Sequence, residues 1–95
     1  MATAVVNDSA SLTLVGGVVD TVRLRHCGSV QIFNRSLTDP IFVRLDGVDP
    51  TVAGDGTKVV LPGTSRQFEI PDPDSPNIRL ISSGLSTDYI IERVP

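Results

Sequence analysis

Apolar residues recur at every second position over much of this chain. In the clearest example, Ile41, Val43 and Leu45 lie on one side, with Phe42 and Arg44 between them on the other. Successive side chains of a β-strand point to opposite faces, so a period of two predicts a half-buried strand. Turn-forming Asp-Gly and Asp-Pro pairs follow directly and are expected to end this strand.

The same alternation predicts about eight short strands, roughly 8–12 residues apart. After the N-terminal segment, the expected strands are 18–25, 29–34, 41–45, 58–61, 66–70, 77–82 and 88–94. No window supports a helix of three turns. The expected fold class is therefore all-β: a single small β-sandwich of about eight short strands, with no long helix. Its strand order is either jelly-roll or immunoglobulin-like, because the number of strands does not determine how they pair.

Residues 1–19 differ from the rest of the chain, because Asp8 is their only charged residue. One interpretation is two ordinary first strands of the sandwich. The other is an N-terminal arm lying across a neighbouring subunit, because an uncharged terminal strand left exposed would promote aggregation. We therefore divide the chain into residues 1–19, an N-terminal arm or first strands, and residues 20–95, the β-sandwich domain. The residues expected at an interface in the first segment are Val5, Val6, Leu12 and Leu14.

The composition fits one small domain with a thin core. Of the 95 residues 40% are hydrophobic, but three are Phe, one is Tyr and none is Trp. Domains of this size bury only roughly 60–65% of the surface of the unfolded chain. The single cysteine, Cys27, allows no intrachain disulfide. Part of the stability is therefore expected to come from association with copies of the chain or with a larger surface.

Charge and hydropathy argue against two classes of partner. The net charge of −3 and the pI near 4.8 disfavour nucleic acid, which requires a basic face. No apolar stretch approaches the ~20 residues of a membrane span, and the N-terminus lacks the features of a signal peptide. Together with the lone cysteine, these features predict a protein that folds in a reducing cytoplasm and is not secreted.

No group of residues has the pattern of a catalytic site, so an enzyme is not expected. His26 and Cys27 are adjacent at a strand end, so their side chains should point to opposite faces and cannot form a nucleophile–base dyad. One His and one Cys are also too few for a structural zinc site. The acidic residues of the C-terminal half lack the aromatic cleft that a glycosidase needs. No catalytic, cofactor-binding or metal-ligating residue is assigned, and no cofactor is expected.

One acidic cluster, formed by Asp46, Asp49 and Asp55, is a candidate for binding a cation. They alternate with glycines, and oxygen-rich, Gly-bent loops are used to hold Ca²⁺. Their spacing is not that of an EF-hand, and Asp and Gly are also the favoured residues of plain turns. A small carbohydrate- or calcium-dependent binding module therefore stays open as an alternative. The aromatic residues available for sugar contact would be Phe33, Phe42 and Tyr89.

The central motif resembles small structural proteins of tailed bacteriophages, which are often encoded among the head genes of phages of actinobacteria. It consists of IFVRLDGVDPTVAGDG at 41–56 and VVLPGT at 59–64, flanked by IFN at 32–34 and LISS at 80–83. The match extends over roughly residues 30–92, so the N-terminal segment lies outside it. The resemblance implies a virion β-sandwich, and within the virion a capsid decoration (cementing) protein. It supplies no catalytic residues.

On this resemblance we expect a virion structural protein that stabilises the phage head by binding across major capsid subunits. It would be made in the host bacterial cytoplasm and sit on the capsid exterior as a homotrimer, with the major capsid protein as its partner. Nucleic acid and membranes are not expected partners. The outward-facing Arg23, Arg25 and Arg44 would pair with carboxylates of the shell, or else form an ordinary solvated sheet face. A tail or head–tail joining protein is the alternative within the virion, and such proteins form larger rings.

Overall fold

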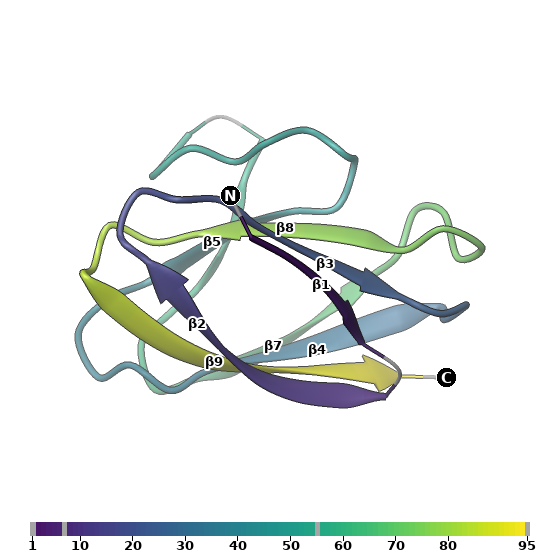
Figure 1. Ribbon diagram of the computed structural model, residues 1–95, viewed down its shortest axis with the longest axis horizontal. Coiled ribbons are helices and arrows are strands. Elements are labelled where there is room, and N and C mark those ends of the chain that lie inside the picture. The colour runs from purple at the N-terminus through teal and green to yellow at the C-terminus, as the bar shows by residue number, and fades with distance from the viewer. Residues whose placement is uncertain (1, 7, 55, 95) are drawn as a thin grey trace.

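The computed structural model describes residues 2–6, 8–54 and 56–94, in which the chain forms nine strands and no helix (Figure 1). The strands are β1 (Ala2–Val6), β2 (Ser9–Val15), β3 (Asp20–Leu24), β4 (Ser29–Asn34), β5 (Ile41–Arg44), β6 (Lys58–Val60), β7 (Ser65–Glu69), β8 (Asn77–Ile81) and β9 (Ser86–Val94). They form two packed sheets, one in the order β1-β3-β8-β5-β6 and the other in the order β2-β9-β4-β7. The expected all-β sandwich is confirmed. Among the described residues, the structure contains no helix that is long and apolar enough to span a membrane.

The strand pairing is nested. β2 pairs with β9, β3 with β8, β4 with β7 and β5 with β6, and all four pairs are antiparallel. This is the pairing of one long hairpin with its tip between β5 and β6, folded over so that successive pairs join alternate sheets. Such a double sheet is a jelly roll. Of the two strand orders left open by the sequence, the structure therefore has the jelly-roll one, with β1 added parallel to β3 at the edge of the five-stranded sheet.

The N-terminal segment forms the first strands of this sandwich. β1 pairs with β3 over all five of its residues, and β2 pairs with β9 from Ser9 to Val15. The interpretation of residues 1–19 as an arm on a neighbouring subunit is therefore corrected. Val6 and Leu14 belong to the core of the chain itself, being only 4% and 0% exposed. The sequence analysis expected both residues at an interface, but their burial in the core leaves them unavailable to a partner.

The core has the alternation that the sequence predicts. Within β3, Val22 and Leu24 are buried while Arg23 between them is exposed, and Ile41 and Val43 of β5 are buried likewise. Ile78 and Leu80 of β8 lie beside these residues in the same sheet. The buried apolar residues of the other sheet include Val30, Ile32, Phe68, Tyr89 and Ile91. Because the core is mostly aliphatic, Tyr89 is its largest fully buried side chain.

Tyr89 also forms a polar link between the two sheets. Its hydroxyl, on β9, donates to the Oδ2 atom of Asp20 on β3 at 3.4 Å. Asp20 is only 8% exposed, and its burial raises the pKa of the carboxyl group, while the bond from Tyr89 acts in the opposite direction. Burial of the phenol and the nearby carboxylate likewise raise the pKa of Tyr89. The interior of the sandwich therefore holds a carboxyl group whose pKa is raised by its burial.

This raised pKa predicts how Asp20→Asn changes the pH dependence of stability. In the native protein, the contribution of Asp20 is most favourable below its ordinary pKa of 3.8 and is lost as the pH rises through the higher folded-state value. The variant cannot ionise and keeps an acceptor for Tyr89. From pH 3 to pH 7 the free energy of unfolding should therefore shift in favour of the variant, measured by urea titration of both proteins. Parallel pH profiles would contradict the prediction.

Candidate functional site

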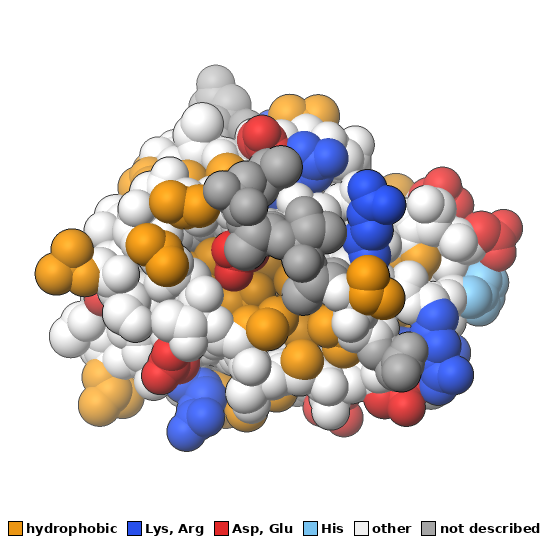
Figure 2. Space-filling model, viewed as in Figure 1, with side chains coloured by type: hydrophobic (Ala, Val, Ile, Leu, Met, Phe, Trp, Pro, Cys, Tyr) orange, Lys and Arg blue, Asp and Glu red, His pale blue; other side chains and the backbone are white. Residues whose placement is uncertain are grey.

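The nested pairing places the loops alternately at two ends of the sandwich, and these ends differ in chemistry. The loops at one end contain Arg35 and Asp39 as their only charged residues, whereas three loops at the other end contain five aspartates. Figure 2 shows hydrophobic side chains protruding at the left end of the molecule and charged side chains at the right. The loops of the first end are 16–19, 35–40, 61–64 and 82–85, and the three of the second are 25–28, 45–57 and 70–76.

We name the first the leucine end, after Leu37, Leu61 and Leu85. Each of these leucines comes from a different loop, and they are 87%, 59% and 93% exposed. Val15, the last residue of β2, is also exposed and directly precedes loop 16–19 of this end. Large aliphatic side chains exposed at one end of a domain, with little charge around them, are typical of a protein–protein contact site.

Buried hydrogen bonds hold the loops of the leucine end together. The amide nitrogen of Asn34, which is fully buried, donates to the carbonyl oxygens of Asp39 and Val60 at 2.8 and 3.0 Å, and its Oδ1 accepts from the Ser36 N–H at 2.9 Å. The Asn34 backbone also exchanges hydrogen bonds with residues 63 and 64. One side chain at the end of β4 therefore fixes both loop 35–40 and the start of loop 61–64.

A second hub fixes the remaining two loops. The buried Ser82 hydroxyl donates to the Pro40 carbonyl at 3.0 Å, and the Ser82 carbonyl accepts from the Gly17 N–H at 2.9 Å. Loops 16–19 and 82–85 approach so closely that a Cβ at Gly16 would lie 2.7 Å from the carbonyl oxygen of Gly84. The leucine end is thus a fixed surface whose side chains are presented on hydrogen-bonded loops.

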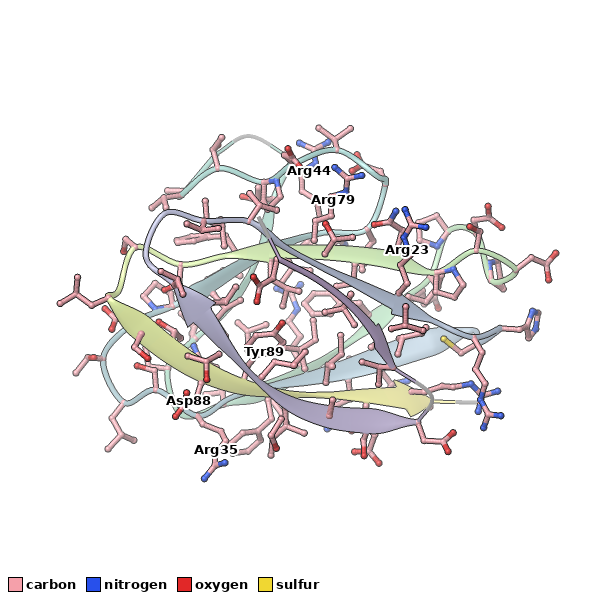
Figure 3. All side chains as sticks on the ribbon, viewed as in Figure 1. Arg23, Arg35, Arg44, Arg79, Asp88 and Tyr89 are labelled. Atoms are coloured by element: carbon pink, nitrogen blue, oxygen red, sulfur yellow. The ribbon has the colours of Figure 1, made fainter. Side chains whose placement is uncertain are left out.

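The central sequence motif has a structural role at the opposite end. Arg44 of β5 and Arg79 of β8 are direct cross-strand neighbours on the outer face of the five-stranded sheet, where like charges repel (Figure 3). Loop 45–57 supplies the compensating carboxylates. Asp46 accepts from Arg44 at 2.5 Å, and Asp49 accepts from Arg79 at 2.5 Å. The Asp-Gly-Val-Asp-Pro run therefore holds its loop against the sheet.

These pairs also bear on the calcium alternative. Hydrogen bonds from Arg44 and from the Val48 N–H lower the pKa of Asp46 to about 2. Gly56 packs against the same guanidinium, since a Cβ there would lie 2.8 Å from Arg44 Nη1. The carboxylates of Asp46 and Asp49 are thus turned toward arginines, and Asp55 lies outside the described residues. Within the described part of the chain, no three His, Cys, Asp or Glu side chains gather as a metal site would require.

Other candidates from the sequence are placed apart from one another. Cys27 is buried, where burial raises the pKa of its thiol, while His26 is exposed and bonds through Nδ1 to Asp74 at 2.8 Å. Both residues lie in loop 25–28 and not on a strand, and one is buried while the other is exposed. Tyr89 is fully buried and cannot stack on a sugar, while Phe33 is exposed and Phe42 half-buried.

Two adjoining depressions lie at the charged end. They have volumes of about 370 and 390 Å³ and share Leu45, Asp46 and Pro71 in their walls. Arg44 also lines the first depression, and its guanidinium is paired there with Asp46. The polar groups at the centre of this end thus bind each other, and we assign no ligand to it.

The structure separates the seven interface residues expected from the sequence. Beyond the buried Val6 and Leu14, Val5 is exposed and Leu12 is half-buried against the core. Among the arginines, Arg23 and Arg25 are exposed, and Arg25 pairs with Asp8 at 2.6 Å, whereas Arg44 is paired with Asp46. The leucines of the leucine end were missed. Leu37 and Leu85 stand between the expected strands, where no strand could bury them, whereas Leu61 is the last residue of the expected strand 58–61.

Comparisons with known proteins bear on the fold alone. The chain matches no protein-family model and no curated protein. Among solved structures, it is similar to a de novo designed double-stranded β-helix, with a TM-score of 0.66 and 18% identity over 90% of this chain and 97% of the other. It is also similar to PliG of Aeromonas hydrophila, a periplasmic inhibitor of g-type lysozyme, with a TM-score of 0.53 and 13% identity over 95% of this chain and 94% of the other. The resemblance to phage structural proteins stays a prediction.

The hub role of Asn34 predicts a selective loss of stability. Asn34→Ala removes three side-chain hydrogen bonds and leaves buried backbone carbonyls without a donor, so it should lower the free energy of unfolding by about 2–4 kcal/mol. Urea unfolding measures this loss. The matched control is Gln31→Ala on the same strand, whose side chain bonds only to Ser65 at the surface and should cost under about 1 kcal/mol. If both variants lose the same free energy of unfolding, the hub role assigned to Asn34 is wrong.

Proposed function

We propose that this chain is a structural protein of a bacteriophage virion. It decorates the exterior of the head and stabilises it by binding across major capsid subunits. Jelly rolls serve many functions, so the fold is compatible with this role without selecting it. The phage setting is supported by the resemblance of the central motif.

The observation that carries the proposal is the leucine end. A decoration protein must attach through its surface alone, and this end offers three exposed leucines on hydrogen-bonded loops with little charge around them. Burying such side chains in a partner contributes roughly 1.5–3 kcal/mol each. We infer that the leucine end contacts the shell.

The alternatives have less support from the described residues. A calcium-dependent module would need carboxylates free to bind the ion, and those of Asp46 and Asp49 are bound to arginines. A sugar-binding module would need an exposed aromatic platform, and of the three candidates Tyr89 is buried, Phe42 is half-buried and Phe33 alone is exposed. A tail or head–tail joining protein would use the same apolar surface within a ring. Its placement in the virion, at the tail or neck instead of over the head, would distinguish it.

Attachment through the leucine end is tested by replacing Leu37, Leu61 and Leu85 together with serine. Because all three side chains are exposed, the variant should fold normally, yet bind phage heads more weakly, by on the order of a thousandfold or more. Cosedimentation with heads from phage grown without this gene measures binding. Val48→Ser with Val52→Ser is the matched control, because these exposed valines lie in loop 45–57 and should not affect binding. If the native chain does not bind the heads, the proposed function is wrong. If the leucine variant binds as tightly as the control, the assignment of the leucine end is wrong.

A further inference from the structure

The sandwich has four edge strands, and they are protected to very different degrees. β6 is three residues long and begins with Lys58, while β7 carries Arg66 and Glu69 and is followed by Pro71. Short length, charge and proline are the usual means by which proteins keep sheet edges from pairing. Arg66 also closes that side, because it donates to the Val59 carbonyl at 3.0 Å and lies over the Phe68 ring.

The opposite side of the sandwich, formed by β1 and β2, lacks this protection. β2 has the sequence SASLTLV, which is seven residues without charge or proline, and it pairs only with β9 within its sheet. Its inward-facing Ala10 and Leu12 are only partly buried. Figure 2 shows hydrophobic side chains in the middle of this face, in the area between the β1 and β2 ribbons of Figure 1.

We infer that the free edge of β2 pairs antiparallel with the β2 strand of a second copy of this chain, forming a two-fold symmetric dimer. The two four-stranded sheets would join into one continuous sheet across this pair. The inference rests on the edge strand alone and holds whatever the leucine end binds.

The sequence of β2 is complementary to itself in one register. With Leu12 placed opposite its own copy, Ala10 faces Leu14 on the inner side, so a small residue meets a large one. On the outer side Ser11 faces Thr13, and Ser–Thr cross-strand pairs are favourable. No charge meets another anywhere along the strand. β2 itself carries no charge that could pair with a charged partner strand, which is why the uncharged second copy is the occupant we choose.

In this register each copy offers the same surface to the other, so the two copies are related by a two-fold axis. The partly buried Leu12 of each copy would be covered by its counterpart, and the apolar side of the sandwich would close. The expected assembly is therefore a dimer, in place of the trimer expected from the sequence.

Two double variants test the register by charge. Ser11→Lys with Thr13→Lys sets lysines opposite each other in both symmetric pairs, whereas Ser11→Glu with Thr13→Lys sets opposite charges there. Both positions face solvent on the outer side of β2, so the core is unchanged in either variant, and both variants lose the Thr13–Asp88 hydrogen bond alike. Light scattering over a range of concentrations should give twice the chain mass of 10.1 kDa for the native protein and for the Glu/Lys variant. The Lys/Lys variant should dissociate on the order of tenfold or more readily.

A crosslink tests the same register independently. Leu12→Cys should form an intermolecular disulfide under mild oxidation, because directly opposed residues lie about 4.5–5.5 Å apart, within disulfide range. Ser9→Cys should not, because Ser9 faces Val15 of the other copy. A native chain that stays monomeric or forms a trimer overturns the inference, as does a dimer that the Lys/Lys variant leaves intact. These measurements use no phage heads, so they fail or succeed independently of the proposed function.

Discussion

The nested antiparallel pairing decides where every loop of this molecule lies. Because β2 pairs with β9, β3 with β8, β4 with β7 and β5 with β6, the connections alternate between the two ends of the sandwich. Turns that are distant in sequence are thereby gathered, and the uncharged ones gather at one end. The same pairing leaves β2 at a sheet edge with no further strand to cover it. Both surfaces considered for binding are therefore consequences of one topological constraint, which the Tyr89–Asp20 bond reinforces by joining the two sheets at their centre.

The most distinctive part of the sequence serves the charged end. Two arginines directly opposite each other on neighbouring strands would repel, and the aspartates of loop 45–57 compensate them from above the sheet. This gives the Arg-x-Asp-Gly-x-Asp-Pro run a physical meaning that is local to the fold. A motif of this kind identifies related architecture, since it specifies how a loop is held. It does not by itself identify a binding surface, and the exposed leucines lie at the other end.

The strands and their inward faces could be predicted because period-two patterning is local. Ile41, Val43 and Phe68 are buried where the alternation places them. The pairing of strands could not be predicted, since it joins residues as distant as Ser9 and Glu92. That is why Val6 and Leu14 were assigned to an interface and Leu37, Leu61 and Leu85 were not. An uncharged terminal segment fits both an arm and an inner strand, and only its partners across the sheet distinguish the two.

The two proposed contacts have a geometric consequence when they are taken together. β2 ends at the leucine end of its own copy, so antiparallel pairing of two β2 strands directs the two leucine ends away from each other. A dimer of this form cannot set both leucine ends on one flat patch of a shell. It can lie along the shell with its two-fold axis upright and reach one capsid subunit on each side. Each leucine end then needs only a modest affinity, because the second contact forms within an already tethered complex. Binding across neighbouring subunits, which a cementing role requires, would follow from the symmetry of the dimer without any further domain.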